Sequence, residues 1–183
     1  MRILQVVHGF PPAASGGTEV YVRDLAAALA ASGADDVMVL TREEDGHRPE
    51  LSVRRSADGP VRVTTINNTF QSCVSFEASY ANPAIDRIAG DVLDDWQPDV
   101  VHVQHLTCLS TGIPRQAARR GIPVVLTLND YWLICHRGQL VDLDGRRCAG
   151  PFGGGCARCL PPGVLAGAAA LRAGRLLRSV ALP

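Results

Sequence analysis

The sequence contains no lysine, because all 18 of its basic residues are arginines. Lysine supplies the phosphate contact of a Walker-type loop, the amine of a Schiff base and one type of general base, so the chain has none of these. Any phosphate group must be bound by Arg, by backbone N–H groups or by another domain. Together with many Ala, Gly and Pro residues, the absence of lysine indicates a GC-rich bacterial gene.

Other absences exclude further classes of protein. The formal net charge of +0 argues against a nucleic-acid-binding protein, which normally has a basic excess. No apolar run reaches the roughly 20 residues that a membrane span needs, and Gln5 and His8 interrupt the N-terminal apolar run as no signal peptide would. We therefore expect a cytoplasmic protein, whose thiols stay reduced. The sequence also lacks Gly-x-Gly-x-x-Gly and Gly-x-Ser-x-Gly, which argues against dinucleotide oxidoreductases and α/β-hydrolases, and we expect no organic cofactor.

Apolar strand patterns alternate with helical patterns along the chain. Strands are expected at 2–8, 36–41, 61–66, 99–105 and 122–128, and helices at 18–33, 82–96, 113–121 and 163–183. This alternation predicts an α/β fold, with a Rossmann-like parallel sheet and helices on both faces, in one domain over residues 1–183. Residues 42–60 are expected to be an exposed excursion, and Thr18 is the expected cap of the first helix. No strand follows the last helix, so we expect a truncated domain.

The loop between the first strand and the first helix is long and stiff. It runs from Gly9 to Gly17 and includes two prolines, whereas such loops usually have about two to six residues. Gly16 and Gly17 lie just before a helix N-terminus, whose free N–H groups and dipole favour an anion, and Glu19 follows in the first turn. The pair either lets a phosphate or sugar approach the backbone or merely forms the turn.

Three further polar residues are expected at the carboxyl ends of strands, where ligands bind in open parallel sheets. His105 ends the strand VVHVQH, and His102, three positions earlier, faces the other side and is expected to be a packed strand residue. Asn129 and Asp130 directly follow the strand at 122–128. Asp130 either accepts a proton or hydrogen bond from a substrate hydroxyl or caps a turn, and Asn129 is able to hydrogen-bond but not to act as a base.

These segments together resemble the N-terminal domain of a GT-B-fold glycosyltransferase of the retaining, family-four type. The matching stretches are ILQVVHGFPPAASGGTEVYVRDLAAAL, PDVVHVQHL and IPVVLTLNDYWLICHRGQL with the cysteines that follow it. The resemblance covers most of the chain, and the spaced cysteines indicate one subgroup.

The resemblance implies transfer of a sugar from a nucleotide-sugar donor to a glycan or lipid-linked acceptor. It implies an acceptor-side domain here and a C-terminal domain that binds the donor, supplied in cis or in trans. By this resemblance Gly16 and Gly17 meet the donor phosphate and sugar, and His105 lies in the cleft. Asn129 departs from the histidine that many relatives carry before Asp130, and the Glu-x7-Glu signature of the donor half is absent. We therefore expect no sugar transfer by these 183 residues alone.

Four cysteines cluster in a loop expected at 135–160. They are Cys135, Cys148, Cys156 and Cys159, and the last two form a Cys-x2-Cys pair. Closely spaced thiolates in a reducing compartment favour tetrahedral zinc, which is structural because four thiolates leave no open position for water. The alternatives are two disulfides or thiols without a ligand.

The segment at 163–183 has two alternative interpretations, and the chain as a whole has two alternative functions. Its arginines at 172, 175 and 178 are opposite its leucines, so the helix either rests on an anionic membrane surface, where lipid-linked acceptors lie, or covers a sheet. The contact with a membrane would be peripheral, at its inner face. The alternative functions are a non-catalytic, zinc-stapled module that binds a sugar or a partner, and another nucleotide-binding Rossmann protein.

Overall fold

The computed structural model of the protein describes residues 1–75, 77–135, 137–151, 156 and 158–159. The chain divides into two compact units. The first unit comprises Met1–Cys73 and Glu77–Thr127, and the second comprises Val74–Phe76 and Leu128–Pro183. The helix expected at 163–183 lies outside the described residues.

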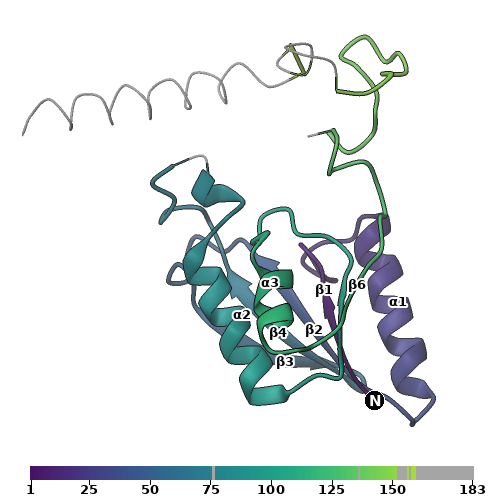
Figure 1. Cartoon of the computed structure of the whole chain (residues 1–183), viewed down its shortest axis with the longest axis vertical. Helices are drawn as coiled ribbons and strands as arrows, with labels where there is room; N and C mark the ends of the chain where they lie inside the picture. The colour runs from purple at the N-terminus through teal and green to yellow at the C-terminus, as the bar shows by residue number, and fades with distance from the viewer. Residues whose placement is uncertain (76, 136, 152–155, 157, 160–183) are drawn as a thin grey trace, which may run out of the picture. The chain divides into compact units, whose positions relative to one another are not determined.

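The first unit is built on a six-stranded sheet (Figure 1). The strands are β1 (Arg2–Val6), β2 (Asp36–Glu43), β3 (Val53–Asp58), β4 (Val61–Asn67), β5 (Val100–Val103) and β6 (Val124–Leu126). Their order is β3-β4-β2-β1-β5-β6, and every neighbouring pair is parallel except β3 and β4. The parallel strands therefore have the order typical of a Rossmann-like sheet, which confirms the expected fold class.

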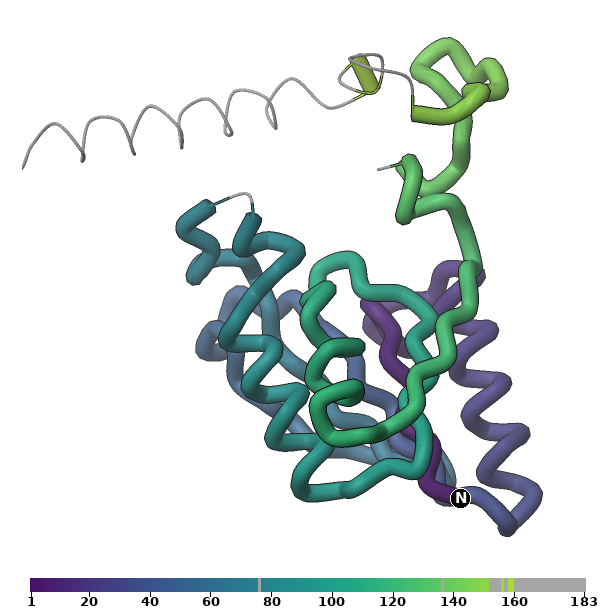
Figure 2. The backbone as a smooth tube through the Cα atoms, in the orientation of Figure 1, coloured from purple at the N-terminus to yellow at the C-terminus, as the bar shows by residue number. Residues whose placement is uncertain are grey.

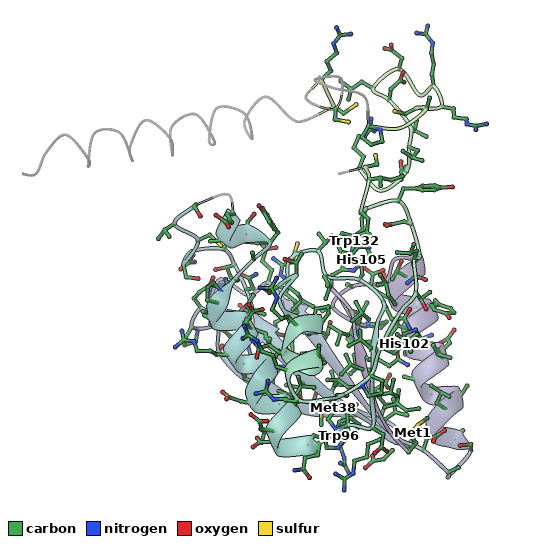
Figure 3. All side chains as sticks on the ribbon, in the orientation of Figure 1. Met1, Met38, Trp96, His102, His105 and Trp132 are labelled. Carbon is green, nitrogen blue, oxygen red and sulfur yellow. The ribbon has the colours of Figure 1, made fainter. Side chains whose placement is uncertain are left out.

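Helices lie on both faces of this sheet, as expected (Figure 1). They are α1 (Gly17–Ala31), α2 (Pro83–Trp96) and α3 (Ile113–Arg119), with a short 3-10 helix η1 at Glu77–Ser79. On one face, Val22 and Ala26 of α1 pack into a buried cluster with alternate residues of β2 and β4. On the other, Met38 of β2 and Trp96 of α2 line a common surface (Figure 3). This two-sided cover explains why the inner strands are apolar on both faces.

The two long helices begin in different ways. Asn82 caps α2 as expected, because its side chain accepts the N–H groups of Ala84 at 2.9 Å and Ile85 at 3.3 Å. The expected Thr18 cap of α1 is wrong: the helix already begins at Gly17, and Gly16 is its N-cap, with no side-chain capping bond. A glycine is well tolerated at this position, and here it also leaves space for the side chain of Glu19.

The region at 42–60 is more ordered than expected. It contains the end of β2 and the whole of β3, which pairs antiparallel with β4 through a two-residue turn at Gly59 and Pro60. The sequence VRRSAD has no apolar alternation, so its strand conformation comes from backbone pairing rather than from burial. As a result β4 is an inner strand, where an outer position was expected.

The strand expected to be buried at 122–128 is instead short and exposed. Only Val124, Val125 and Leu126 form β6, and they are 37%, 49% and 48% exposed. This strand lies at the edge of the sheet and pairs only with β5. An apolar run predicts a strand, but its burial depends on what covers it.

Candidate active site

The order in which the chain adds strands to the sheet reverses between β1 and β5. From β1 the chain continues to β2 on one side, and it later returns to β5 on the other side. The loops that follow these two strands start at the same end of the sheet (Figure 2), and the backbone N–H groups of Gln104 and His105 both donate to the carbonyl of Val6. Ligands bind at such switch points in open α/β sheets.

Two histidines meet at this point. His8 follows β1, His105 follows β5, and their ring centroids are 4.2 Å apart with the planes tilted by 52°. His105 is only 4% exposed and lies toward the loop end of β5 relative to His102 (Figure 3). Its Nδ1 accepts the N–H of Thr107 at 3.2 Å, so in the neutral ring the proton is on Nε2. The neutral His105 ring is thus able to donate a hydrogen bond from Nε2.

Glu19 joins the histidines from the first turn of α1. Its Oε1 is 3.0 Å from Nε2 of His8, and the two form an ion pair when His8 is protonated. The Glu19 residue is 9% exposed. The positive end of the helix dipole stabilises the carboxylate. We name His8, Glu19 and His105 the histidine–glutamate cluster.

Gly16 and Gly17 have different tasks. A Cβ on Gly16 would lie 2.6 Å from Oε2 of Glu19, so this position must be glycine for the carboxylate to fit. A Cβ on Gly17 would meet nothing within 4 Å, so open space surrounds this residue at the helix N-terminus. The sequence assigns both glycines to the donor, and this stays a prediction, while the structure adds that Gly16 leaves space for Glu19.

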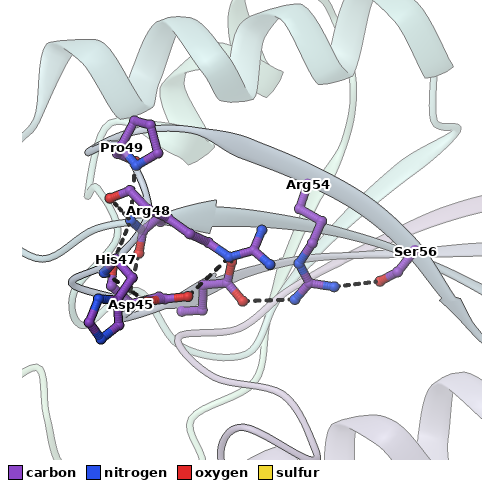
Figure 4. Close-up of polar contacts among 8 residues, drawn as sticks. Asp45, His47, Arg48, Pro49, Arg54 and Ser56 are labelled. Carbon is purple, nitrogen blue, oxygen red and sulfur yellow. Dashed lines mark hydrogen bonds and ion pairs between the residues drawn. The ribbon is translucent and has the colours of Figure 1, made fainter.

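A pocket of about 260 Å³ lies between the opening loop and the sheet. The loop contributes Phe10, Pro11, Pro12 and Ala13, and strands β2, β3 and β4 supply most of the remaining wall. Thr41 lines the pocket, is 2% exposed, and its hydroxyl has no hydrogen-bond partner among the described residues. Arg54 is fixed between Glu43 Oε2 at 2.7 Å and Ser56 Oγ at 3.4 Å (Figure 4). The wall of the pocket thus includes a guanidinium group that is paired with a carboxylate and, beneath the surface, a hydroxyl without a hydrogen-bond partner among the described residues.

His102 is a strand residue outside the histidine–glutamate cluster, as expected. Its Nε2 is 2.7 Å from Oγ1 of Thr127, next to the end of β6. Burial lowers its pKa below the usual value of 6.5. It therefore serves as an internal comparison for His105, since both histidines come from the same strand segment.

The sequence of this chain places it in a known family. Residues 16–175 match the family described as the glycosyl transferase 4-like domain. The chain belongs to this family. The matched range includes the N-cap of α1, Glu19, His105 and all four clustered cysteines. No curated protein matches the chain.

The glycosyl transferase 4-like chain is also similar to solved structures. The sucrose-phosphate synthase of Thermosynechococcus elongatus has 21% identity and a TM-score of 0.45, over 68% of this chain and 31% of that one. A structure titled trehalose-6-phosphate from E. coli bound with UDP-2-fluoro glucose has 13% identity and a TM-score of 0.43, over 69% of this chain and 32% of that one. The chain thus spans about a third of the length of these proteins.

Asn129 and Asp130 belong to the second unit of the glycosyl transferase 4-like chain, whereas the histidine–glutamate cluster belongs to the first. Oδ1 of Asp130 accepts the N–H of Trp132 at 2.8 Å, so the carboxylate closes an Asx turn, which was one of the two expected tasks. A Cβ on Gly138 would lie 2.9 Å from Oδ2 of Asp130. Catalytic tasks for Asn129, Asp130 and His105 stay predictions.

The four clustered cysteines are also in the second unit. All four side chains are half-buried. Burial raises the pKa of the Cys135 thiol, but backbone N–H groups of residues 137–140 outweigh this effect, so that the pKa lies below its ordinary value. In the described ranges, no three side chains of His, Cys, Asp or Glu already form a metal site.

His8 was not among the predicted site residues, although a signal for it existed. It lies two residues beyond the end of β1, as His105 lies two residues beyond the end of β5, and the carboxyl ends of parallel strands share one edge of a sheet. The pocket with Thr41 and Arg54 had no comparable signal, because β3 was not expected. Among the helices that the structure describes, none is long and apolar enough to cross a membrane.

Proposed function

We propose that the chain forms the acceptor-side domain of a retaining glycosyltransferase, which moves a sugar from a nucleotide-sugar donor to a glycan or lipid-linked acceptor. The observation that carries this proposal is the histidine–glutamate cluster at the switch point of a chain in the glycosyl transferase 4-like family. Two imidazoles and a carboxylate in contact provide a place to hold and orient a proton beside sugar hydroxyls.

Gly17 faces the donor in this proposal. The open space around Gly17 and the free N–H groups of the first turn of α1 favour an anionic group there. The helix dipole offsets the negative charge of Glu19, whose Oε1 lies 3.0 Å from Nε2 of His8. The diphosphate of a nucleotide sugar matches this environment, and Gly16 acts indirectly by leaving space for Glu19.

The pocket below the opening loop is the proposed acceptor subsite. Arg54, which is held by Glu43 and Ser56, presents its remaining N–H groups to hydroxyl groups of the acceptor. The prolines and Phe10 of the loop supply an apolar wall for the sugar ring. This subsite selects the acceptor, and the histidine–glutamate cluster acts at the reacting hydroxyl.

The leaving diphosphate needs positive charge beside the histidine–glutamate cluster. Negative charge builds on the leaving oxygens, and its stabilisation is a main catalytic task. The sequence has no lysine, and two of the described arginines, Arg42 and Arg54, are paired with Glu44 and Glu43. We propose that a donor-binding domain supplies the missing charge.

A transfer assay with two histidine variants tests the proposal. In the protein expressed from its full reading frame, His105→Ala should lower transfer from a labelled nucleotide sugar by about 10²-fold or more, since proton transfer groups contribute on this scale. His102→Gln is the control and should keep its activity, because His102 contacts Thr127 outside the cluster. Equal activities of the two variants would remove His105 from the mechanism. Sugar binding without transfer by the wild type would instead favour the binding module.

A further inference from the structure

Four of the six cysteines line a single pocket in the second unit. This pocket has a volume of about 400 Å³, and its wall includes Cys135, Cys148, Cys156 and Cys159. All four side chains are half-buried. The other two cysteines, Cys73 and Cys108, belong to the first unit. A common wall for four thiols from one loop is an arrangement that neither the fold nor the histidine–glutamate cluster requires.

A short hairpin places Cys148 beside Leu140. Asp142 donates its N–H to the carbonyl of Arg146 at 2.9 Å, and Val141 forms a bridge with Arg147. The N–H of Cys148 then donates to the carbonyl of Leu140 at 2.7 Å. Cys148 is therefore held next to the chain segment that begins at Cys135.

The chain turns back on itself directly after Cys135. Gly138 donates its N–H to the carbonyl of Cys135 at 2.8 Å. Gly138 and Leu140 have positive φ angles of 73° and 51°. This turn leads from Cys135 to Leu140, whose carbonyl accepts the N–H of Cys148.

The remaining two thiols come from Cys-x2-Cys. This spacing is typical of metal-binding pairs, because one turn of chain presents both sulfurs to the same ion. Cys156 and Cys159 both line the pocket, and Arg158 between them lines it too. The guanidinium charge favours a site that carries negative charge.

The described part of the second unit also has little apolar core to hold it together. The buried hydrophobic residues of the described chain end at Ala117, before the second unit resumes at Leu128. Leu143 and Ile134 line the pocket and are 67% and 50% exposed. Small units that lack a hydrophobic core are commonly stabilised by a metal or by disulfides.

We propose that Cys135, Cys148, Cys156 and Cys159 bind one structural Zn²⁺ ion. Each thiol releases its proton as its sulfur becomes a ligand, so that four protons leave when one ion binds all four thiols. The described side chains do not yet form a metal site, so the ion must draw the sulfurs inward to about 2.3 Å from itself. The free energy of binding then stabilises the loop. Four thiolates complete the tetrahedron and leave no position for a reactive water.

Metal analysis of the purified 183-residue chain tests this site. After purification under reducing conditions without a chelator, we expect about one zinc per chain. Cys148→Ser and the double variant Cys156→Ser/Cys159→Ser should lose most of this zinc. Cys73→Ser is the matched control and should keep it, because Cys73 lies in the first unit and its thiol donates to the carbonyl of Ala78.

A second measurement does not depend on whether the variants fold. Co²⁺ alone, added to the metal-free wild type, should produce the visible absorption bands of a tetrahedral thiolate site. These bands should disappear when Zn²⁺ is added, because Zn²⁺ displaces Co²⁺ from the site. A chain without zinc whose four thiols react freely, two disulfides found by mass spectrometry, or iron in place of zinc would each overturn the proposal.

Discussion

At the scale of single residues, neighbouring glycines have different tasks. Gly16 leaves space for a buried carboxylate, and Gly17 faces open space. The two residues are both glycines and are adjacent in sequence. Their roles differ because the side chain of Glu19 lies against Gly16 and not against Gly17. Substitution at each of them should therefore separate stability from activity.

Gly16→Ala should lower the free energy of unfolding by about 1–2 kcal/mol, because the new Cβ displaces Glu19 from His8 and alanine is a poor N-cap. Gly17→Ala should leave stability unchanged or raise it by about 0.5 kcal/mol, since alanine favours the helix. Urea unfolding of both variants measures the difference. Equal losses would contradict the assignment. In the full protein, Gly17→Ala should also weaken donor binding.

His102 should make stability depend on pH. Because burial lowers its folded-state pKa below 6.5, the unfolded chain binds the proton more readily. The contribution of His102 to the free energy of unfolding is therefore fully present above about pH 6.5, and it is lost as the pH falls through the folded-state pKa. The wild type should therefore lose more stability than His102→Gln between about pH 7.5 and 5.5. Parallel slopes in denaturant unfolding over this range would show that His102 does not contribute.

At the scale of elements, adjacent strands of similar composition have opposite surroundings. Val103 of β5 is 1% exposed, and Leu126, its register partner on β6, is 48% exposed. The difference follows from position, because β5 pairs on both sides and β6 lies at the edge. Strand composition alone therefore overestimated the burial of β6.

This contrast predicts unequal effects of truncation. Val103→Ala should cost about 2 kcal/mol of the free energy of unfolding, because it removes fully buried methyl groups. Leu126→Ala removes more atoms but should cost less than about 1 kcal/mol, since half of the side chain is already in water. Chemical denaturation of the two variants provides the comparison. A larger loss for Leu126→Ala would mean that β6 is covered in solution.

At the scale of the whole molecule, the chain spans about a third of the solved structures that resemble it. Its first unit holds the histidine–glutamate cluster, and its second unit holds the cysteines. The 183 residues by themselves should show no sugar transfer, because they lack both the Glu-x7-Glu signature and lysine for the leaving diphosphate. A radiolabelled-donor assay measures this directly, and turnover by these residues alone would contradict it.

The sequence by itself determined the local structure of this protein and its family. Apolar runs predicted the strands, and Asn82-Pro83 predicted the start of α2, because periodicity and capping act over a few residues. Only the tertiary structure decided that His8, Glu19 and His105 meet, that β3 joins the sheet, and that β6 is exposed. The reason is that strand order and burial depend on contacts between segments far apart in the chain: His8 and His105 share a site because β1 and β5 pair.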